Sequence, residues 1–253
     1  MLEINKIHLG DCLELMKEIG DKSIDMICCD LPYGETNNEE DVIIPFDELW
    51  KHYKRIIKDN GAIVLFAQGL FYVDLVNSNR DWYRYDLVWD KILVSDFLNA
   101  NVKPLRVHEQ IAVFCKEKTI YNPQMRVGEP LHSKGKTYLN KEDKNNNYGK
   151  YQKILDNRCG ETQKYPTIVI TCQKPHPSIA KHRTEKPIKL LEYLIKTYSN
   201  EGDLILDNCS GSGTTAIACY NTRRNFICIE KDKDYYEKSV ERLDIARSQL
   251  RLF

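Results

Sequence analysis

The sequence lacks several features that mark particular classes of protein. No stretch approaches the roughly 18 consecutive apolar residues that cross a bilayer, which excludes a transmembrane helix. The nine cysteines include no C-x-x-C pair, and several lie in apolar runs, so we predict small buried thiols and no metal site. Met1 leads directly into the strand-like residues 2–7, so we predict no signal peptide and a cytoplasmic protein.

The chain also has no net charge, because 37 basic residues balance 37 acidic ones. The basic residues nevertheless gather in one segment. Residues 116–186 hold 15 Lys and Arg against 7 Asp and Glu, an excess of 8 that the rest of the chain balances. A basic segment on a neutral protein is typical of a nucleic-acid-binding surface, although a solvated lysine-rich loop gives the same count.

Three zones follow one another along the 253 residues. Residues 1–116 and 181–253 alternate strand-like and helical patterns, whereas residues 117–180 lose this periodicity and are rich in Lys, Asn and Tyr. This order predicts an α/β domain, with a mostly parallel sheet and helices on both faces, interrupted by a small basic lobe. We expect strands at 4–8, 25–29, 62–66, 87–89, 110–115, 204–206 and 226–229, a lobe strand at 167–171, and helices at 11–19, from 45 to a stop at Asn60-Gly61, at 69–77, and from 187, 214 and 232.

A glycine turn lies between two elements of the last zone. The residues 207–215 read Asp-Asn-Cys-Ser-Gly-Ser-Gly-Thr-Thr, and Glu230 ends the next strand. Strand, glycine turn, helix, strand and acid is the order of a nucleoside-binding βαβ unit, in which Gly211 and Gly213 let the backbone turn tightly and approach a ligand. The third glycine of the dinucleotide fingerprint and a Gly-Lys-Ser/Thr loop are both missing, so a nucleoside without phosphates fits better than NAD.

A second motif follows the apolar run 25–29, where Asp30-Leu31-Pro32-Tyr33 closes the expected strand. Open α/β sheets bind ligands at the carboxyl ends of their strands. A planar ring beside fixed hydrogen-bond acceptors suits a flat, amine-bearing substrate such as a nucleobase. Taken alone, the same residues also fit an ordinary proline turn.

The two motifs resemble those of the S-adenosylmethionine-dependent DNA amino-methyltransferases, in the permuted (β-class) order that puts the catalytic motif first. The family's Asp-Pro-Pro-Tyr is similar to residues 30–33, with Leu31 in place of a proline. Its Asp-x-Phe-x-Gly-Ser-Gly-Thr-Thr is similar to residues 207–215, with Cys209 in place of phenylalanine. Thr184-Glu185-Lys186-Pro187 and Gly10-Asp11-Cys12 resemble two further blocks, and the acid of the second contacts the cofactor adenine in the family.

The resemblance implies a Rossmann-like methyltransferase fold. Residues 1–116 would form its catalytic part, 117–180 a target-recognition insertion and 181–253 its cofactor-binding part. The residues implied in binding S-adenosylmethionine are Asp11, Lys186, Asp207, Cys209, Ser210, Gly211, Ser212, Gly213, Thr214 and Glu230.

The resemblance also implies a mechanism. The target amine is a poor nucleophile because its lone pair is delocalised into the ring. The Asp30 carboxylate and the Leu31 carbonyl would accept its hydrogens and expose the lone pair for in-line attack. Tyr33 would stack on a base rotated out of the duplex, and Pro32 would fix the turn.

An initial Asp in this motif accompanies adenine N6 more often than cytosine N4, so we expect a site-specific adenine-N6 enzyme acting on double-stranded DNA. A cytosine-N4 enzyme, an inactive DNA-binding protein of the same fold, and an RNA or protein-glutamine methyltransferase remain alternatives. Methylation at cytosine carbon-5 needs a nucleophilic thiol, usually in a Pro-Cys pair, and the chain has none.

The expected partners and contacts follow from the same resemblance. The enzyme would associate with the nucleoid, stand alone or beside a cognate restriction nuclease, and be a monomer or homodimer. His108 and Glu109 precede an expected strand and are candidates to support the site, although a structural, hydrogen-bonded His108 is favoured. We expect Trp50, Trp82 and Trp89 to lie in the core. The residues expected to contact DNA phosphates are Arg126, Lys134, Lys136, Lys150, Lys153 and Arg158.

Overall fold

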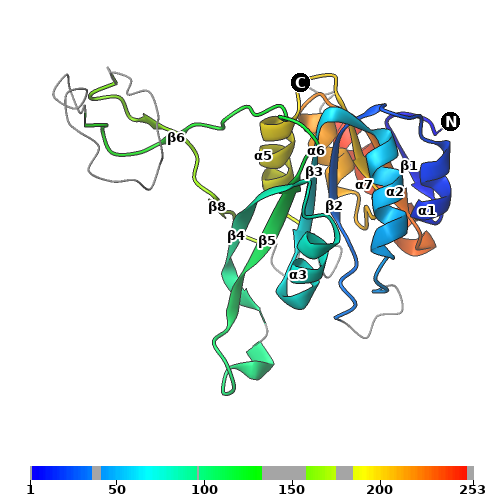
Figure 1. The fold of residues 1–253 in the computed structure, drawn as a ribbon, viewed down its shortest axis with the longest axis horizontal. Helices are drawn as coiled ribbons and strands as arrows, with labels where there is room; N and C mark the ends of the chain where they lie inside the picture. Colours follow the sequence, from blue (N-terminus) through cyan, green and yellow to red (C-terminus); the bar gives the residue numbers. More distant parts are fainter. Residues whose placement is uncertain (1, 36–40, 96, 133–157, 175–184, 250–253) are drawn as a thin grey trace. The chain divides into compact units, whose positions relative to one another are not determined.

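The computed structural model describes residues 2–35, 41–95, 97–132, 158–174 and 185–249. The chain forms two compact units, Met1–Asn122 with Ile168–Phe253 and, between them in sequence, Pro123–Thr167. Figure 1 labels most of the helices and strands of the larger unit. They are β1 (Lys6–Leu9), α1 (Cys12–Leu15), the 3-10 helix η1 (Met16–Glu18), β2 (Ile24–Asp30), α2 (Phe46–Ile56), β3 (Ile57–Ala67), α3 (Gly69–Ser78), β4 (Tyr83–Ser95), η2 (Phe97–Asn99), β5 (Arg106–Phe114), β8 (Val169–Thr171), α5 (Ile188–Tyr198), β9 (Leu204–Asp207), α6 (Thr214–Asn221), β10 (Asn225–Glu230) and α7 (Lys233–Gln249).

Within the described residues, the strands of the larger unit form one eight-stranded sheet in the order β1-β10-β9-β2-β3-β5-β4-β8. Neighbouring strands are parallel from β1 to β3, β5 is antiparallel to β3 and β4, and β8 is parallel to β4. The predicted mostly parallel α/β fold is therefore confirmed. Because β5 runs the other way, its first residues lie at the edge where the parallel strands end.

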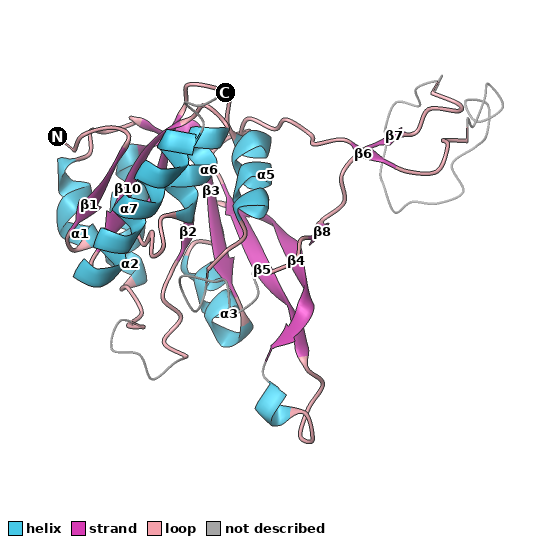
Figure 2. Cartoon of the chain, turned by 180° about the vertical axis from the view of Figure 1, so that it is seen from behind, coloured by secondary structure: helices cyan, strands magenta, loops and turns pink. Residues whose placement is uncertain are grey.

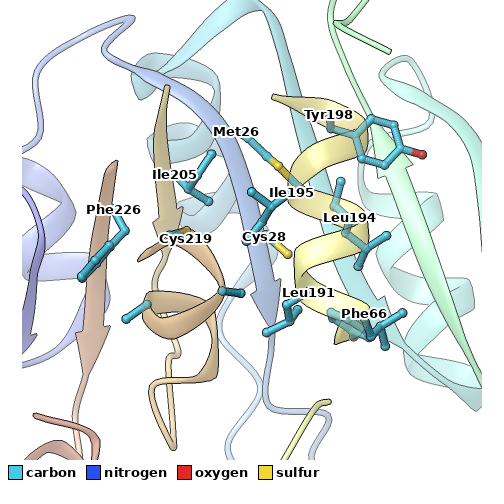
Figure 3. Packing of buried hydrophobic residues seen from close by; sticks show 14 of the residues in the cluster. Met26, Cys28, Phe66, Leu191, Leu194, Ile195, Tyr198, Ile205, Cys219 and Phe226 are labelled. Carbon is cyan, nitrogen blue, oxygen red and sulfur yellow. The ribbon is translucent and has the colours of Figure 1, made fainter. Parts of the chain in front are cut away.

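Helices cover both faces of this sheet (Figure 2). Alternate residues of β2 divide between the faces, as the two-residue period of a strand requires. Met26 and Cys28 join the core beneath α5, α6 and α7 (Figure 3), whereas Ile27 and Cys29 join the core beneath α1, α2 and α3. A strand buried on both faces reads as a continuous apolar run, which explains the pattern at 25–29.

Most cysteines and tryptophans lie where the sequence predicted. Trp50 and Trp89 are buried in the core, and Trp82 is partly buried against it. The cysteines buried as predicted are Cys12, Cys28, Cys29, Cys115, Cys219 and Cys228; Cys172 and Cys209 are partly buried, and Cys159 is exposed. Among the described helices, none combines the length and apolar character that crossing a bilayer demands.

The predicted stop of the second helix at Asn60-Gly61 is wrong. Helix α2 ends at Ile56, and β3 begins at the next residue. Its pairing with β2 shifts register between Ile57 and Ala62, so Asn60-Gly61 marks a bulge within a strand. A Cβ at Gly61 would lie 2.8 Å from the Asp25 carbonyl oxygen, which is why glycine occupies this position.

The strand expected in the basic lobe at 167–171 instead belongs to the main sheet. β8 pairs with β4, with Val169 opposite Val88 and Ile170 opposite Trp89. The indole of Trp89 donates a hydrogen bond of 2.7 Å to the Cys172 carbonyl, which attaches the segment just after β8. The smaller unit contains the antiparallel pair β6 (Arg126–Val127) and β7 (Gln163–Lys164).

Candidate active site

A cavity of about 1070 Å³ opens at the edge where the parallel strands end. Both sequence motifs line it: residues 30–33 at the end of β2, and 207–212, Thr214 and Thr215 at and beyond the end of β9. Asp11, Lys186 and Glu230 line the same cavity, and Gly213 does not. The structure thus brings together, from distant parts of the chain, an acidic corner and a glycine turn.

Asp30 is the last residue of β2, and its side chain keeps 25% of its surface exposed, enough to face the cavity. One carboxylate oxygen accepts a hydrogen bond of 2.6 Å from the Tyr33 hydroxyl, and the other accepts one of 2.6 Å from Lys186 Nζ. Burial raises the pKa of Asp30, while the Lys186 charge opposes that shift. The Tyr33 ring stacks on Phe71 of α3, with ring centres 4.9 Å apart.

Lys186 connects this corner to Glu109, which the sequence offered as a candidate to support the site, and to Lys91, which it did not. Its ammonium also lies 3.1 Å from Glu109 of β5, and Glu109 accepts a hydrogen bond of 3.1 Å from Lys91 of β4. Burial disfavours the charged form of Lys186, but Asp30 and Glu109 outweigh it and raise its pKa. The contact partners are far apart in sequence, so only the sheet order reveals them.

The glycine turn after β9 is held by Glu230. Its two carboxylate oxygens accept hydrogen bonds from the Gly211 amide at 2.7 Å and the Asp232 amide at 2.8 Å. Burial raises the pKa of Glu230, and these amides limit the rise. Each carboxylate oxygen has a second lone pair, so Glu230 can still accept hydrogen bonds from a ligand in the cavity.

Gly213 precedes α6 with a left-handed φ of 72°, as a tight turn requires. We expected the missing side chain to admit a ligand. In the structure its closest neighbours belong to the protein itself: an added Cβ would lie 2.9 Å from Ser239 Cβ of α7 and 3.3 Å from Ile7 Cδ1. Glycine at 213 therefore allows α7 to pack against the turn.

Asp207 and Ser210 are buried residues of the glycine-turn segment that line the cavity. Asp207 is buried and accepts hydrogen bonds from the Thr215 hydroxyl and, at 3.2 Å, from the Cys209 amide, and burial raises its pKa to about 6. Ser210 Oγ is buried on the cavity wall and has no hydrogen-bond partner within the described part of the chain. An orphaned buried hydroxyl fits a site that a polar ligand completes.

Arg242 of α7 supports the turn from behind, and the sequence gave no signal for it. Its guanidinium donates hydrogen bonds to the Ser212 carbonyl at 3.1 Å and to Thr214 Oγ1 at 3.0 Å, and it pairs with the buried Glu185.

Asp11 caps α1 by accepting a hydrogen bond of 2.9 Å from the Leu13 amide. Lys231 lies 3.5 Å from the same carboxylate.

Two of the six predicted DNA contacts fall within the described residues. Arg126 and Arg158 belong to the smaller unit, where Arg126 donates a hydrogen bond to the Tyr165 carbonyl and Arg158 lies over the Tyr165 ring. Lys134, Lys136, Lys150 and Lys153 lie outside the described residues. Five basic residues that we did not predict line the cavity: Lys91, Lys103, Arg106, Lys174 and Lys231.

A mostly parallel sheet whose strand ends place a nucleoside-type glycine turn and an acidic corner on one cavity is typical of enzymes that bind a nucleoside cofactor beside a second substrate. Comparison with known proteins identifies the family. Residues 24–241 match the model of the N6_N4_Mtase family, described as DNA methylase. The chain belongs to this family of S-adenosylmethionine-dependent DNA amino-methyltransferases, which confirms the predicted resemblance.

Individual relatives cover nearly the whole chain. The type II methyltransferase M2.MboI of Moraxella bovis is 29% identical over 93% of this chain and 86% of its own. The DNA adenine methyltransferase YhdJ of Escherichia coli is 26% identical over 96% of this chain and 84% of its own. The crystal structure of an M1.HpyAVI–SAM complex has the same fold, with a TM-score of 0.62 and 24% identity, and the match covers 94% of this chain and 99% of that one.

Proposed function

We propose that the protein transfers a methyl group from S-adenosylmethionine to the exocyclic N6 of an adenine rotated out of double-stranded DNA. The observation that carries this proposal is the single cavity lined by both the Asp30 corner and the glycine turn. Names of relatives such as YhdJ, a DNA adenine methyltransferase, support adenine as the base. An initial Asp in the catalytic motif supports the same choice.

The residues around the glycine turn suit a nucleoside with an amino-acid tail. Glu230 and Asp11 would accept hydrogen bonds from ribose and adenine. The Ser210 hydroxyl, which has no partner among the residues that the structure describes, would bind a polar group of the ligand. The predicted contacts of Asp207, Cys209, Gly211, Ser212 and Thr214 belong to this proposal, whereas Gly213 does not line the cavity. When bound, S-adenosylmethionine supplies an electrophilic methyl group on a sulfonium.

Asp30 can serve the target amine despite its two partners. A carboxylate offers about four acceptor positions, and the hydrogen bonds from Tyr33 and Lys186 use two of them. A remaining position would accept one amine hydrogen, and the Leu31 carbonyl would accept the other. Transfer would form the N6–methyl bond as the sulfonium–methyl bond breaks, with the thioether S-adenosylhomocysteine as the leaving group. The extra proton on N6 would pass to water in the open cavity, which restores a neutral secondary amine. Pro32 would fix the turn, and the Tyr33 face away from Phe71 would stack on the base.

The remaining parts of the proposal concern DNA and location. Residues 117–180 would recognise the target between the catalytic part, 1–116, and the cofactor part, 181–253. Arg126, Lys134, Lys136, Lys150, Lys153 and Arg158 would contact phosphates, which positions the duplex without reading its sequence. We place the protein in the cytoplasm at the nucleoid, as a monomer or homodimer, alone or beside a cognate restriction nuclease. The name of the relative M2.MboI, a type II methyltransferase, supports the restriction–modification setting.

The matched family also includes cytosine-N4 enzymes, so cytosine N4 is the second candidate. The test is to methylate duplex DNA with the purified protein, digest the DNA, and identify the modified nucleoside by mass spectrometry. We expect N6-methyldeoxyadenosine, absent with an Asp30→Ala variant. N4-methyldeoxycytidine would refute the choice of base, and labelled RNA or peptide in preference to DNA would refute the choice of substrate.

A further inference from the structure

Four charged side chains meet at the catalytic end of the cavity, in the order Asp30, Lys186, Glu109 and Lys91. Lys186 Nζ lies 2.6 Å from an Asp30 oxygen and 3.1 Å from a Glu109 oxygen, and the other Glu109 oxygen lies 3.1 Å from Lys91 Nζ. Lys186, Glu109 and Lys91 are only 9%, 13% and 4% exposed. All four line the cavity and come from four different segments of the sheet unit.

Such a network is a poor device for stability alone. Removing charges from water costs several kcal/mol per ion, and apolar replacements of similar volume are often as stable or more so. The network also has an apolar setting, since Lys186 Nζ lies 5.0 Å from the centre of the Phe66 ring and 5.8 Å from that of Trp89. Asp30 is the member of the network that belongs to the catalytic motif. We therefore look for the role of the network in its effect on Asp30.

We infer that Glu109, supported by Lys91, is a positioning residue for methyl transfer: it holds the Lys186 ammonium against Asp30, and the ammonium in turn keeps the Asp30 carboxylate correctly turned toward the cavity. This inference rests on the proposed function and deepens it. It gives Lys186 a different task from the cofactor contact expected from the sequence.

Charge balance makes the inference testable. Groups that face Asp30 are Tyr33 after β2, Glu109 on β5, Lys186 before α5 and, further off, Asp207 on β9. Taken as ionised, the four members of the network sum to zero. Removing Lys186 leaves a net negative charge around Asp30, which favours its protonation, whereas removing Glu109 leaves a net positive charge, which opposes it. Removing both restores the balance.

The experiment is single-turnover methyl transfer to duplex DNA as a function of pH, with cofactor affinity measured by calorimetry. In Lys186→Gln we expect the acidic limb of the rate profile to move up by about 1 to 3 pH units. In Glu109→Gln the limb moves down, and the plateau rate falls about 10- to 100-fold because Asp30 is misplaced. The double variant returns the limb to within half a unit or so of the wild type, by the same charge argument.

The matched control is Lys58→Gln, which removes another lysine bound to an aspartate of β2. Lys58 lies 2.6 Å from Asp25, and neither residue lines the cavity. We expect its pH limb and plateau rate to equal those of the wild type. Cofactor affinity should stay within about threefold in every variant, which is less than 1 kcal/mol.

Coincident acidic limbs in the wild type, Lys186→Gln and Glu109→Gln would overturn the inference. Loss of cofactor affinity in Lys186→Gln with an unmoved limb would return Lys186 to a cofactor contact. If the wild type transfers no methyl group to DNA, the proposed function fails by itself. Carboxyl NMR titration of Asp30 in the wild type and Glu109→Gln then decides the inference, which predicts a lower Asp30 pKa in the variant.

Discussion

Gly213 is tightly packed in the glycine turn, so replacing it with alanine should lower the free energy of unfolding. The loss has two parts, one from the backbone conformation and one from packing against α7. The left-handed φ of 72° costs a residue with a Cβ about 1–2 kcal/mol. The new Cβ would also lie 2.9 Å from Ser239 Cβ and 3.4 Å from Ser239 Cα on α7, and overpacking of this kind costs about 1–3 kcal/mol. We therefore expect Gly213→Ala to lower the free energy of unfolding by about 2–5 kcal/mol.

Gly202 offers a matched control. It has a left-handed φ of 86°, but an added Cβ would meet no atom within 4 Å, so Gly202→Ala should cost only the backbone part, about 1–2 kcal/mol. The assay is urea denaturation of both variants and the wild type, with a shared slope to confirm comparable transitions. Adding Ser239→Gly to Gly213→Ala should recover part of the packing cost in a double-mutant cycle. Equal costs at positions 213 and 202, or a cycle without coupling, would refute the packing explanation.

Three further predictions concern the site. Asp30→Ala and Tyr33→Ala should each lower the turnover number by about 10²-fold or more while calorimetry shows unchanged cofactor affinity; equal loss of affinity in both would contradict the assigned roles. Arg242→Gln should weaken cofactor binding about tenfold, which is about 1.4 kcal/mol, through the loosened turn, and unchanged affinity in a folded variant would contradict its support of Ser212 and Thr214. The raised pKa of Asp207, about 6, means that the folded state binds the proton more tightly, so this group's contribution to stability declines as pH rises from about 4 to 6. The measured quantity is the free energy of unfolding of Asp207→Asn minus that of the wild type. This difference should be about 1–3 kcal/mol more positive at pH 7.5 than at pH 4. A difference that does not change with pH would contradict this sign.

The sequence was informative where chemistry and local geometry coincide. Three signals are local in the sequence: the apolar run buried on both faces, the turn residues after it, and the glycine pattern near Gly211. They were therefore enough to predict the strands and helices beside them and the edge of the sheet where the site lies. Asn60-Gly61 misled because a glycine before a strand ends a helix as readily as it forms a bulge. Residues 167–171 misled because a strand as short as β8, Val169–Thr171, carries no sequence signal of the sheet that it joins.

Residues that act through distant partners were not predictable in this way. Glu109 faces Lys186 only because β5 is antiparallel and lies two strands from β2, and that order has no local signature. Arg242 lies on the final helix, and its contacts with Ser212 and Glu185 depend on how α7 crosses the turn. The packing of Ser239 against Gly213 depends on the same crossing.

The central claim is that one cavity presents a methyl donor at the glycine turn to an amine held at Asp30. The most direct measurement is a crystal structure of the protein with S-adenosylhomocysteine, whose sulfur stands for the donor sulfonium after transfer. We predict that its ribose lies at Glu230, its adenine near Asp11, and its sulfur on the side of the cavity that faces Asp30. A ligand bound in another cavity, or one whose sulfur points away from Asp30, would contradict the account.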